Sequence, residues 1–206
     1  MDRVKKIGLF GGSFNPPHWG HFNLAMELKE KKQLDEVWLI PAHLNPHKYL
    51  QTAVSSAHRF EMVKAAAEDF PDFFVNDVEL RRPPPSYTVD TLKILISETK
   101  QAADLSFYLL LGEDAAAHFT TWHAPLEIIE LATLLVGSRE GKGSLAGIKD
   151  LKIRSALEKG WTVTHKMDIS SRAIRLRLSA GLCCAHLVPA SVLRYIRTHG
   201  LYTHHE

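Results

Sequence analysis

The sequence predicts an α/β protein built on a mostly parallel sheet with helices on both faces. Short apolar runs, typical of strands, alternate along the chain with segments of helical period. The first run ends in two glycines, and a helical pattern begins soon after them. Since alternating strands and helices form βαβ units with right-handed crossovers, the strands should lie parallel.

Six segments are predicted as strands, because each is short, apolar or alternating, and bounded by Gly, Pro or polar residues. In chain order they are residues 4–10, 36–40, 73–78, 105–111, 133–136 and 161–164. Six further segments have helical period: residues 18–31, 56–67, 88–100, 126–132, 171–179 and 190–199. Residues 138–150, "SREGKGSLAGIKD", are rich in glycine and charge, and we expect an exposed insertion there rather than a domain boundary.

The composition fits one folded domain. The 206 residues are 45% hydrophobic and 23% charged, and the net charge of +2 is too even for a protein whose main partner is duplex nucleic acid. Cys183 and Cys184 are adjacent and have no other cysteine as a partner, so a reducing cytoplasm fits best. No apolar run approaches the roughly 20 residues of a membrane span, and the start lacks the pattern of a signal peptide. We therefore expect no membrane partner, whereas the oligomeric state cannot be read from the sequence.

The loop after the first predicted strand, "GGSFNPPHWGH", is the first candidate site. Ligands of parallel sheets bind outside the carboxyl ends of the strands. Gly11 and Gly12 allow close approach of a ligand, and a helix that begins near His18 directs unpaired N–H groups at the same space. His18 and His21 lie three residues apart on one face, where both imidazoles can donate to phosphate oxygens. The loop therefore favours an anion, and Gly20 leaves room for a flat or bulky group against the helix.

Other interpretations of this loop stay open at this point. The two histidines could bind a metal, although no third ligand lies within the stretch. They could also be surface histidines, in a chain that has 12. The glycines could belong to a dinucleotide-binding loop, although the G-x-G-x-x-G spacing is absent.

Four motifs, in the right order, resemble those of the bacterial nicotinate mononucleotide adenylyltransferases of the H-x-G-H nucleotidyltransferase superfamily. "GGSFNPPHWGH" resembles the H-x-G-H signature, and "PSYTVDTL" resembles the segment beside the pyridine ring. "LGEDAAAHFTTW" resembles the G-x-D segment with its following tryptophan, and "ISSRAIR" resembles the triphosphate-binding segment. "IPAHLNPHK" and "YIRTHGLY" also fit, so the resemblance covers nearly the whole chain.

The resemblance implies transfer of AMP from ATP to nicotinate mononucleotide, giving deamido-NAD and pyrophosphate. It implies one Rossmann-like nucleotidyltransferase domain over residues 1–206, in which about 168–206 form a small C-terminal helical part. ATP and nicotinate mononucleotide are then the partners, and Mg²⁺ would arrive on ATP without dedicated protein ligands. The phosphate of the mononucleotide is itself the nucleophile, so the enzyme must hold two anions in line and neutralise charge.

The resemblance also implies the site residues. His18, His21 and Arg175 would be catalytic, through contacts with the phosphates of ATP. ATP would bind at Gly11, Gly12, Ser13, Phe14, His18, His21, Lys48, Gly112, Asp114, Ile169, Ser170, Ser171 and Arg175. The pyridine mononucleotide would bind at Gly12, Ser13, Lys48, Tyr87, Thr88, Asp114, Trp122 and His123. A helix beginning near Pro125 would favour the carboxylate of nicotinate over a neutral amide.

Structural roles compete with several of these assignments. Ser170 and Ser171 are good caps for an ordinary amphipathic helix, Asp114 could cap a helix, and Tyr87 and Trp122 could be core aromatics. The chain also departs from the family pattern: it has Ser13 and Arg172 where threonine is usual, and Asn15 where aspartate is commoner.

Three other functions remain as alternatives. Another H-x-G-H transferase would act on phosphopantetheine, a cytidylyl substrate or nicotinamide mononucleotide, but would not need "SYTVDTL" or the Trp122 segment. A regulatory module could bind nucleotide without turnover, although the histidines and Arg175 are intact. A nucleic-acid binder is disfavoured because the arginines lack an interleaved aromatic stripe.

Overall fold

The computed structural model describes residues 3–44, 54–99, 105–138, 145, 147–165 and 167–203. Within them, six strands form one all-parallel sheet in the order β3-β2-β1-β4-β5-β6. The strands are β1 (Lys5–Gly12), β2 (Glu36–Pro41), β3 (Phe73–Val75), β4 (Leu105–Gly112), β5 (Thr133–Ser138) and β6 (Trp161–Val163). The helices are α1 (Trp19–Lys32), α2 (Ser56–Ala67), α3 (Thr88–Thr99), α4 (Glu113–Ala117), the 3-10 turn η1 (Phe119–Thr121), α5 (Pro125–Leu131), α6 (Leu151–Gly160), α7 (Ser171–Ser179) and α8 (Ala190–Thr198).

The strand order reverses between β1 and β4. The chain builds outward from β1 through β2 to β3, then returns to place β4 on the other side of β1. The two strands pair in parallel with Leu9 opposite Leu109. Connections from these neighbouring strands leave in opposite directions, which opens a crevice at their carboxyl ends, where ligands of such sheets bind.

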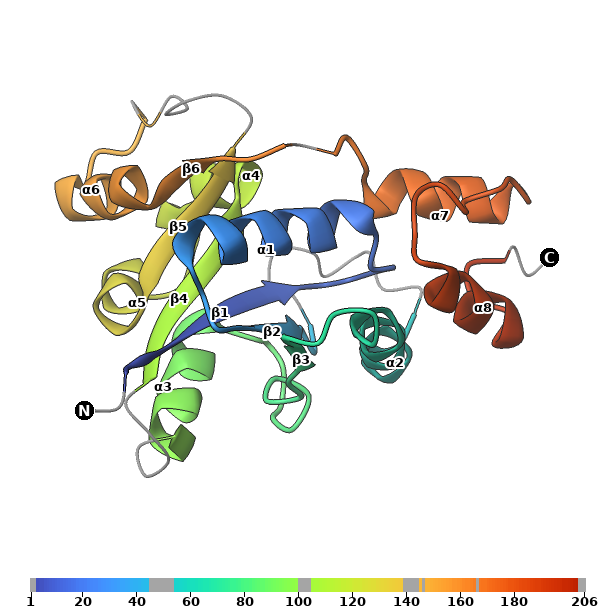
Figure 1. Cartoon of the computed structure of the whole chain (residues 1–206), viewed down its shortest axis with the longest axis horizontal. Coiled ribbons are helices and arrows are strands. Elements are labelled where there is room, and N and C mark those ends of the chain that lie inside the picture. The colour runs from blue at the N-terminus through green and yellow to red at the C-terminus, as the bar shows by residue number, and fades with distance from the viewer. Residues whose placement is uncertain are drawn as a thin grey trace.

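Two apolar clusters, one on each face of the sheet, hold the helices in place. Residues of α1, α2, α7 and α8 share one cluster with the strands, and residues of α3, α4, α5 and α6 share the other. Figure 1 shows α2, α7 and α8 at one end of the molecule, with α8 nearer to α2, and α5 and α6 at the opposite end. The expectation of a parallel sheet covered on both faces is confirmed.

The predicted strands and helices are present, with changes at their ends. The strand β3 stops at Val75, three residues early, because the side chain of Asn76 accepts the N–H of Val78 at 2.9 Å and turns the chain. The first helix begins one residue later than expected, with His18 as its N-cap, and α3 is described to Thr99.

The prediction was wrong for part of residues 138–150 and missed three short elements. Ser138 ends β5 and is buried, and Leu145 and Ile148 are buried in the apolar cluster. Gly147, Lys149 and Asp150 are exposed, so the described part of this segment is only partly an exposed insertion. The helix α6 follows it, capped by Asp150, which accepts the N–H groups of Lys152 and Ile153. The two short turns α4 and η1 were also missed. No helix in the described part of the chain is long and apolar enough to cross a membrane.

Candidate active site

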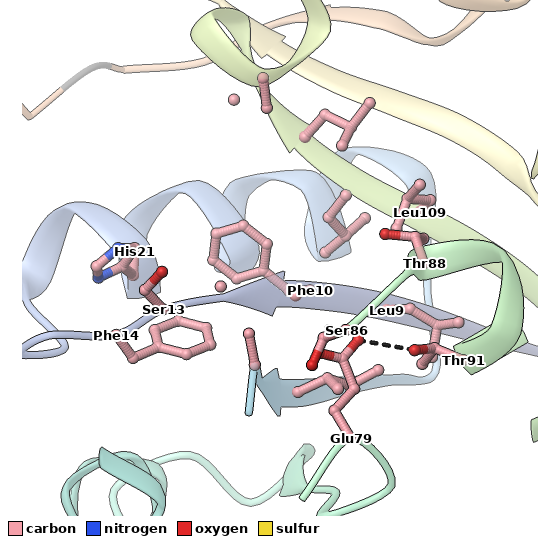
Figure 2. A pocket seen from close by; sticks show the side chains of 18 of the residues that line it. Leu9, Phe10, Ser13, Phe14, His21, Glu79, Ser86, Thr88, Thr91 and Leu109 are labelled. Carbon is pink, nitrogen blue, oxygen red and sulfur yellow. Dashed lines mark hydrogen bonds between the residues drawn. The ribbon is translucent and has the colours of Figure 1, made fainter. Parts of the chain in front are cut away.

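A cavity of about 500 Å³ opens at the carboxyl ends of β1 and β4, where the strand order reverses. Gly11 and Gly12 border it from β1, and Gly112 borders it from β4. A Cβ on Gly12 would come within 3.1 Å of the ring of Phe14, so a larger residue here would press on that buried ring. Figure 2 shows the rings of Phe10 and Phe14 and the imidazole of His21 along one side of the cavity.

The two histidines of the first helix stack on each other. Their ring centroids lie 3.6 Å apart with 24° between the planes. The backbone N–H of His18 donates to Nδ1 of His21 at 3.2 Å. Because Nδ1 accepts this hydrogen bond, the ring proton of His21 is assigned to Nε2, from which the ring can donate. His21 lines the cavity and His18 does not.

His18 lies beneath its neighbour, against the helix. It is 6% exposed, and its buried Nδ1 has no hydrogen-bond partner among the described residues. A Cβ on Gly20 would approach the ring of His18 to 3.1 Å. The group that Gly20 accommodates is therefore the imidazole of His18 itself.

We expect the protein to lose stability as the pH falls from 6.5 towards 4. Burial lowers the pKa of His18 from 6.5 to about 4, so in this range the unfolded chain binds a proton that the folded chain excludes. The contribution of His18 to the free energy of unfolding is fully present above pH 6.5. Between pH 6.5 and about 4 it falls by about 1.4 kcal/mol per pH unit. Urea unfolding between pH 7 and pH 5 should show a shallower pH dependence in His18→Gln than in the wild type.

The exposed His186 supplies the control for this measurement. His186→Gln should keep the wild-type pH dependence. If the free energy of unfolding depended equally on pH in His18→Gln and in the wild type, the lowered pKa of His18 would be contradicted.

Hydrogen bonds between distant parts of the chain fix the start of α7 to the first loop. The hydroxyl of Ser171 donates to the carbonyl of Pro16 at 2.9 Å, and Nη1 of Arg175 donates to the carbonyl of Asn15 at 2.8 Å. The hydroxyl of Tyr202 donates to Oδ1 of Asn15 at 2.6 Å. Ser171 and Arg175 both line the cavity, so the N-terminal end of α7 faces the space that His21 borders.

Aromatic rings border the other end of the cavity. The rings of Tyr87 and His123 lie 4.5 Å apart, and Trp122 packs on Phe119 at 5.3 Å. Tyr87, Trp122 and His123 line the cavity. Trp122 therefore combines core packing on one side with exposure to the cavity on the other. The helix α5 begins at Pro125, directly after this group.

The structure brings most of the sequence-predicted site residues to this one cavity. Those that line it are Gly11, Gly12, Ser13, Phe14, His21, Tyr87, Thr88, Gly112, Asp114, Trp122, His123, Ser171 and Arg175. Ile169 and Ser170 are not among the lining residues, and the hydroxyl of Ser170 caps α7 by accepting the N–H of Ala173. The N-cap of α4 is Gly112, so Asp114 is not the cap residue. Lys48 lies outside the described residues.

Two buried charged residues that line the cavity were missed. Arg59 of α2 is 2% exposed and donates to the carbonyls of Ser13 at 2.7 Å and His43 at 2.8 Å. It thereby joins the loops that follow β1 and β2. Glu79 is 6% exposed. Neither has a local sequence signal, because a lone charged residue in a helix or loop is normally solvated.

The described residues contain no group of three or more His, Cys, Asp or Glu side chains that could hold a metal ion. Asp114 is exposed at the edge of the cavity.

Comparisons with known proteins agree with this geometry. A family model described as cytidylyltransferase-like matches residues 9–177. A probable nicotinate-nucleotide adenylyltransferase of Salinibacter ruber is 39% identical over 196 residues, which cover 95% of this chain and 97% of the relative. A protein of the same description from Bacillus pumilus is 36% identical, with 97% of this chain and 99% of the relative covered.

The fold is also that of a solved enzyme. The nicotinic acid mononucleotide adenylyltransferase of Plasmodium falciparum, complexed with NaAD, superposes with a TM-score of 0.75 at 19% identity, covering 96% of this chain and 97% of that one. The near-full-length matches to curated relatives place this chain in the nicotinate-nucleotide adenylyltransferase family, within the cytidylyltransferase-like proteins.

Proposed function

We propose that this chain, which belongs to the nicotinate-nucleotide adenylyltransferase family, transfers AMP from ATP to nicotinate mononucleotide. A phosphate oxygen of the mononucleotide attacks the α-phosphorus of ATP. A new P–O bond forms there while the bond between the α-phosphorus and the bridging oxygen breaks, releasing pyrophosphate. The products are deamido-NAD and pyrophosphate, and no covalent bond to the protein is needed.

The observation that carries this proposal is the convergence of two helix starts on one cavity. The start of α1 brings His21, and the start of α7 brings Ser171 and Arg175. The N-terminal end of a helix is electropositive because its peptide dipoles align. Two such ends, with an imidazole and a guanidinium between them, suit a polyphosphate that gains charge on its leaving group.

His21, Ser171 and Arg175 would act on the phosphates directly. Nε2 of His21 donates a hydrogen bond, and Arg175 supplies a permanent positive charge. The bond from Arg175 to Asn15 uses Nη1, so its other guanidinium N–H groups can bind oxygen atoms of ATP. His18 would support His21 through the ring stack and the backbone hydrogen bond.

The pyridine ring would lie at the other end, against Trp122, Tyr87 and His123. The first-turn amides of α3, beginning at Thr88, and the backbone before α5 would supply donors to the carboxylate of nicotinate. Asp114 would contact ribose hydroxyls, as carboxylates do in related α/β folds. Lys48 would close over the polyphosphate.

Mg²⁺ would be bound to the polyphosphate and keep much of its water shell. It would supply charge neutralisation there, while the protein residues bind and orient the two substrates. The same proposal treats residues 1–206 as one domain, in which about 168–206 form the C-terminal helical part that carries Ser171 and Arg175 to the cavity.

The test is pyrophosphate release from purified protein supplied with ATP, Mg²⁺ and each mononucleotide in turn. We expect nicotinate mononucleotide to be preferred over the nicotinamide form by at least ~10-fold in kcat/KM, or about 1.4 kcal/mol. The end of the cavity at Tyr87 and Trp122 would offer N–H donors to a carboxylate. The same donors would repel the NH₂ group of an amide, which is itself a donor.

Two variants sharpen this test. Trp122→Ala should reduce kcat/KM more than Thr88→Val, because the indole provides a ring face whereas Thr88 contributes mainly its backbone. Equal efficiency with both mononucleotides would contradict the carboxylate site. ATP binding without pyrophosphate release would favour a regulatory module instead.

A further inference from the structure

Glu79 is a buried carboxyl group in the wall of the cavity, in the segment that joins β3 to α3. The hydroxyl of Thr91 donates to Oε1 of Glu79 at 2.7 Å. The hydroxyl of Ser86 lies beside the same carboxylate and lowers its pKa. Figure 2 shows Glu79 beside Ser86, with the dashed bond to Thr91 and with Thr88 nearby. The carboxylate of Glu79 therefore lies between Ser86, which precedes α3, and Thr91, which belongs to its first turn.

Arg82 completes this group from the same segment. Its Nη2 donates to the hydroxyl of Thr91 at 2.5 Å and to the carbonyl of Tyr87 at 3.0 Å, and lies 3.8 Å from Oε1 of Glu79. The carbonyl of Tyr87 also accepts the N–H of Thr91 at 3.2 Å. Burial raises the pKa of Glu79, and the charges of Arg82 and Arg59 oppose that shift. The side-chain contacts of Glu79 and Arg82 with Thr91 and with the carbonyl of Tyr87 lie at the first turn of α3.

Ser86 connects the same group to the loop after β2. Its N–H donates to the carbonyl of Leu44 at 3.1 Å, and its Oγ accepts the N–H of His43 at 3.0 Å. Ser86 and Thr91 are 8% and 3% exposed. Hydrogen bonds buried to this degree define position more strictly than exposed ones, because no water can replace a partner that moves away.

We propose that Glu79 is a positioning residue for the pyridine mononucleotide, holding Ser86 and Thr91 so that Tyr87 and Thr88 form the wall of the pyridine site. The inference rests on the proposed function. Glu79 acts through the hydroxyl of Thr91 and through Ser86 beside it. It does not act by contact with the reacting phosphates, for which we propose the end bordered by His21 and Arg175. Its loss should therefore affect the pyridine substrate and leave ATP binding unchanged.

The experiment measures the KM for each substrate, kcat and the thermal unfolding midpoint in Glu79→Ala and Glu79→Gln. Glu79→Ala should raise the KM for nicotinate mononucleotide by at least ~10-fold, the loss expected from one buried hydrogen bond to a charged group. The KM for ATP should stay within about 2-fold, because the ATP contacts are separate. The preference for nicotinate over nicotinamide mononucleotide should also fall. Glu79→Gln keeps an acceptor oxygen, so it should recover most of the affinity.

Glu98→Ala is the matched control. Glu98 is also a carboxylate on the α3 side of the molecule, but it is exposed and pairs with Arg81 at 3.2 Å. Its removal should leave both KM values unchanged.

Two results would overturn the inference. One is an unchanged KM for the mononucleotide in Glu79→Ala. The other is a parallel loss in both KM values and kcat with a lowered unfolding midpoint, which would mean that Glu79 only supports the fold. If Glu79→Ala does not fold, Thr91→Val decides the question, because it removes the hydroxyl at nearly constant shape and should raise the same KM by about 3-fold or more. Absence of turnover in the wild type would instead overturn the proposed function.

Discussion

His21→Ala should lower kcat by roughly 10²–10³-fold, the usual effect of removing one preorganised donor from an oxyanion site. The hydrogen bond from the backbone of His18 to Nδ1 leaves Nε2 of His21 as the donor. This donor is held in place before substrate binds, because the ring stacks on His18 and packs edge-on against Phe14. Alanine removes both the donor and its preorganisation.

Steady-state kinetics with saturating ATP and nicotinate mononucleotide measure this effect. His18→Ala should also lower kcat strongly, in its case by removing the ring on which His21 is stacked. The exposed His186 provides the control variant, His186→Ala, which should keep wild-type kcat. Near-normal turnover of His21→Ala, with an unfolding midpoint close to that of the wild type, would remove His21 from the catalytic residues.

Arg175→Ala should lower kcat/KM for ATP by about 10–150-fold, which corresponds to the 1.5–3 kcal/mol of a charged hydrogen bond. Arg175 lines the cavity at the start of α7, and its bond to Asn15 holds the guanidinium there before ATP binds. Arg172 lies on the same helix but is exposed, and it is not among the residues that line the cavity.

Arg172→Thr is the matched comparison, since it removes a positive charge from the same helical turn. It should change kcat/KM for ATP by no more than about 2-fold, because an exposed charge is screened by solvent. Tyr202→Phe removes the hydrogen bond from Tyr202 to Oδ1 of Asn15 and leaves Arg175 in place. It therefore measures how much the position of Asn15 contributes to the effect of Arg175. A larger loss in Arg172→Thr than in Arg175→Ala would mean that the triphosphate is held on the outer face of α7.

Much of the fold could be predicted because its signals are local. Each strand is a short apolar run, and hydrophobic periodicity identifies the helices without reference to the rest of the chain. The helix α6 was missed although its signals were present: Asp150 caps it, and Ile153 and Leu157 lie four residues apart on its buried side. The glycine-rich residues before it directed the interpretation towards a loop. The short α4 was missed because five residues carry too little periodic pattern.

The sequence by itself determined where the two helix starts at the cavity, for which we propose phosphate binding, lie in the chain. Glycine-rich turns, a histidine pair three residues apart and a serine cap followed by arginine are local features, and each indicates an anion site through backbone geometry. The motifs were therefore found, with the residues that belong to them.

Only the tertiary structure decided which of these residues reach the cavity and which are buried beside it. It buried His18 and left His21 at the cavity, because the ring of His18 packs over Gly20 at the helix start. It anchored Arg175 to Asn15, 160 residues away in sequence. It also brought the buried charges of Arg59 and Glu79 to the cavity wall. These contacts join elements from opposite ends of the chain or from neighbouring loops, and they form when apolar faces pack, which no local pattern encodes.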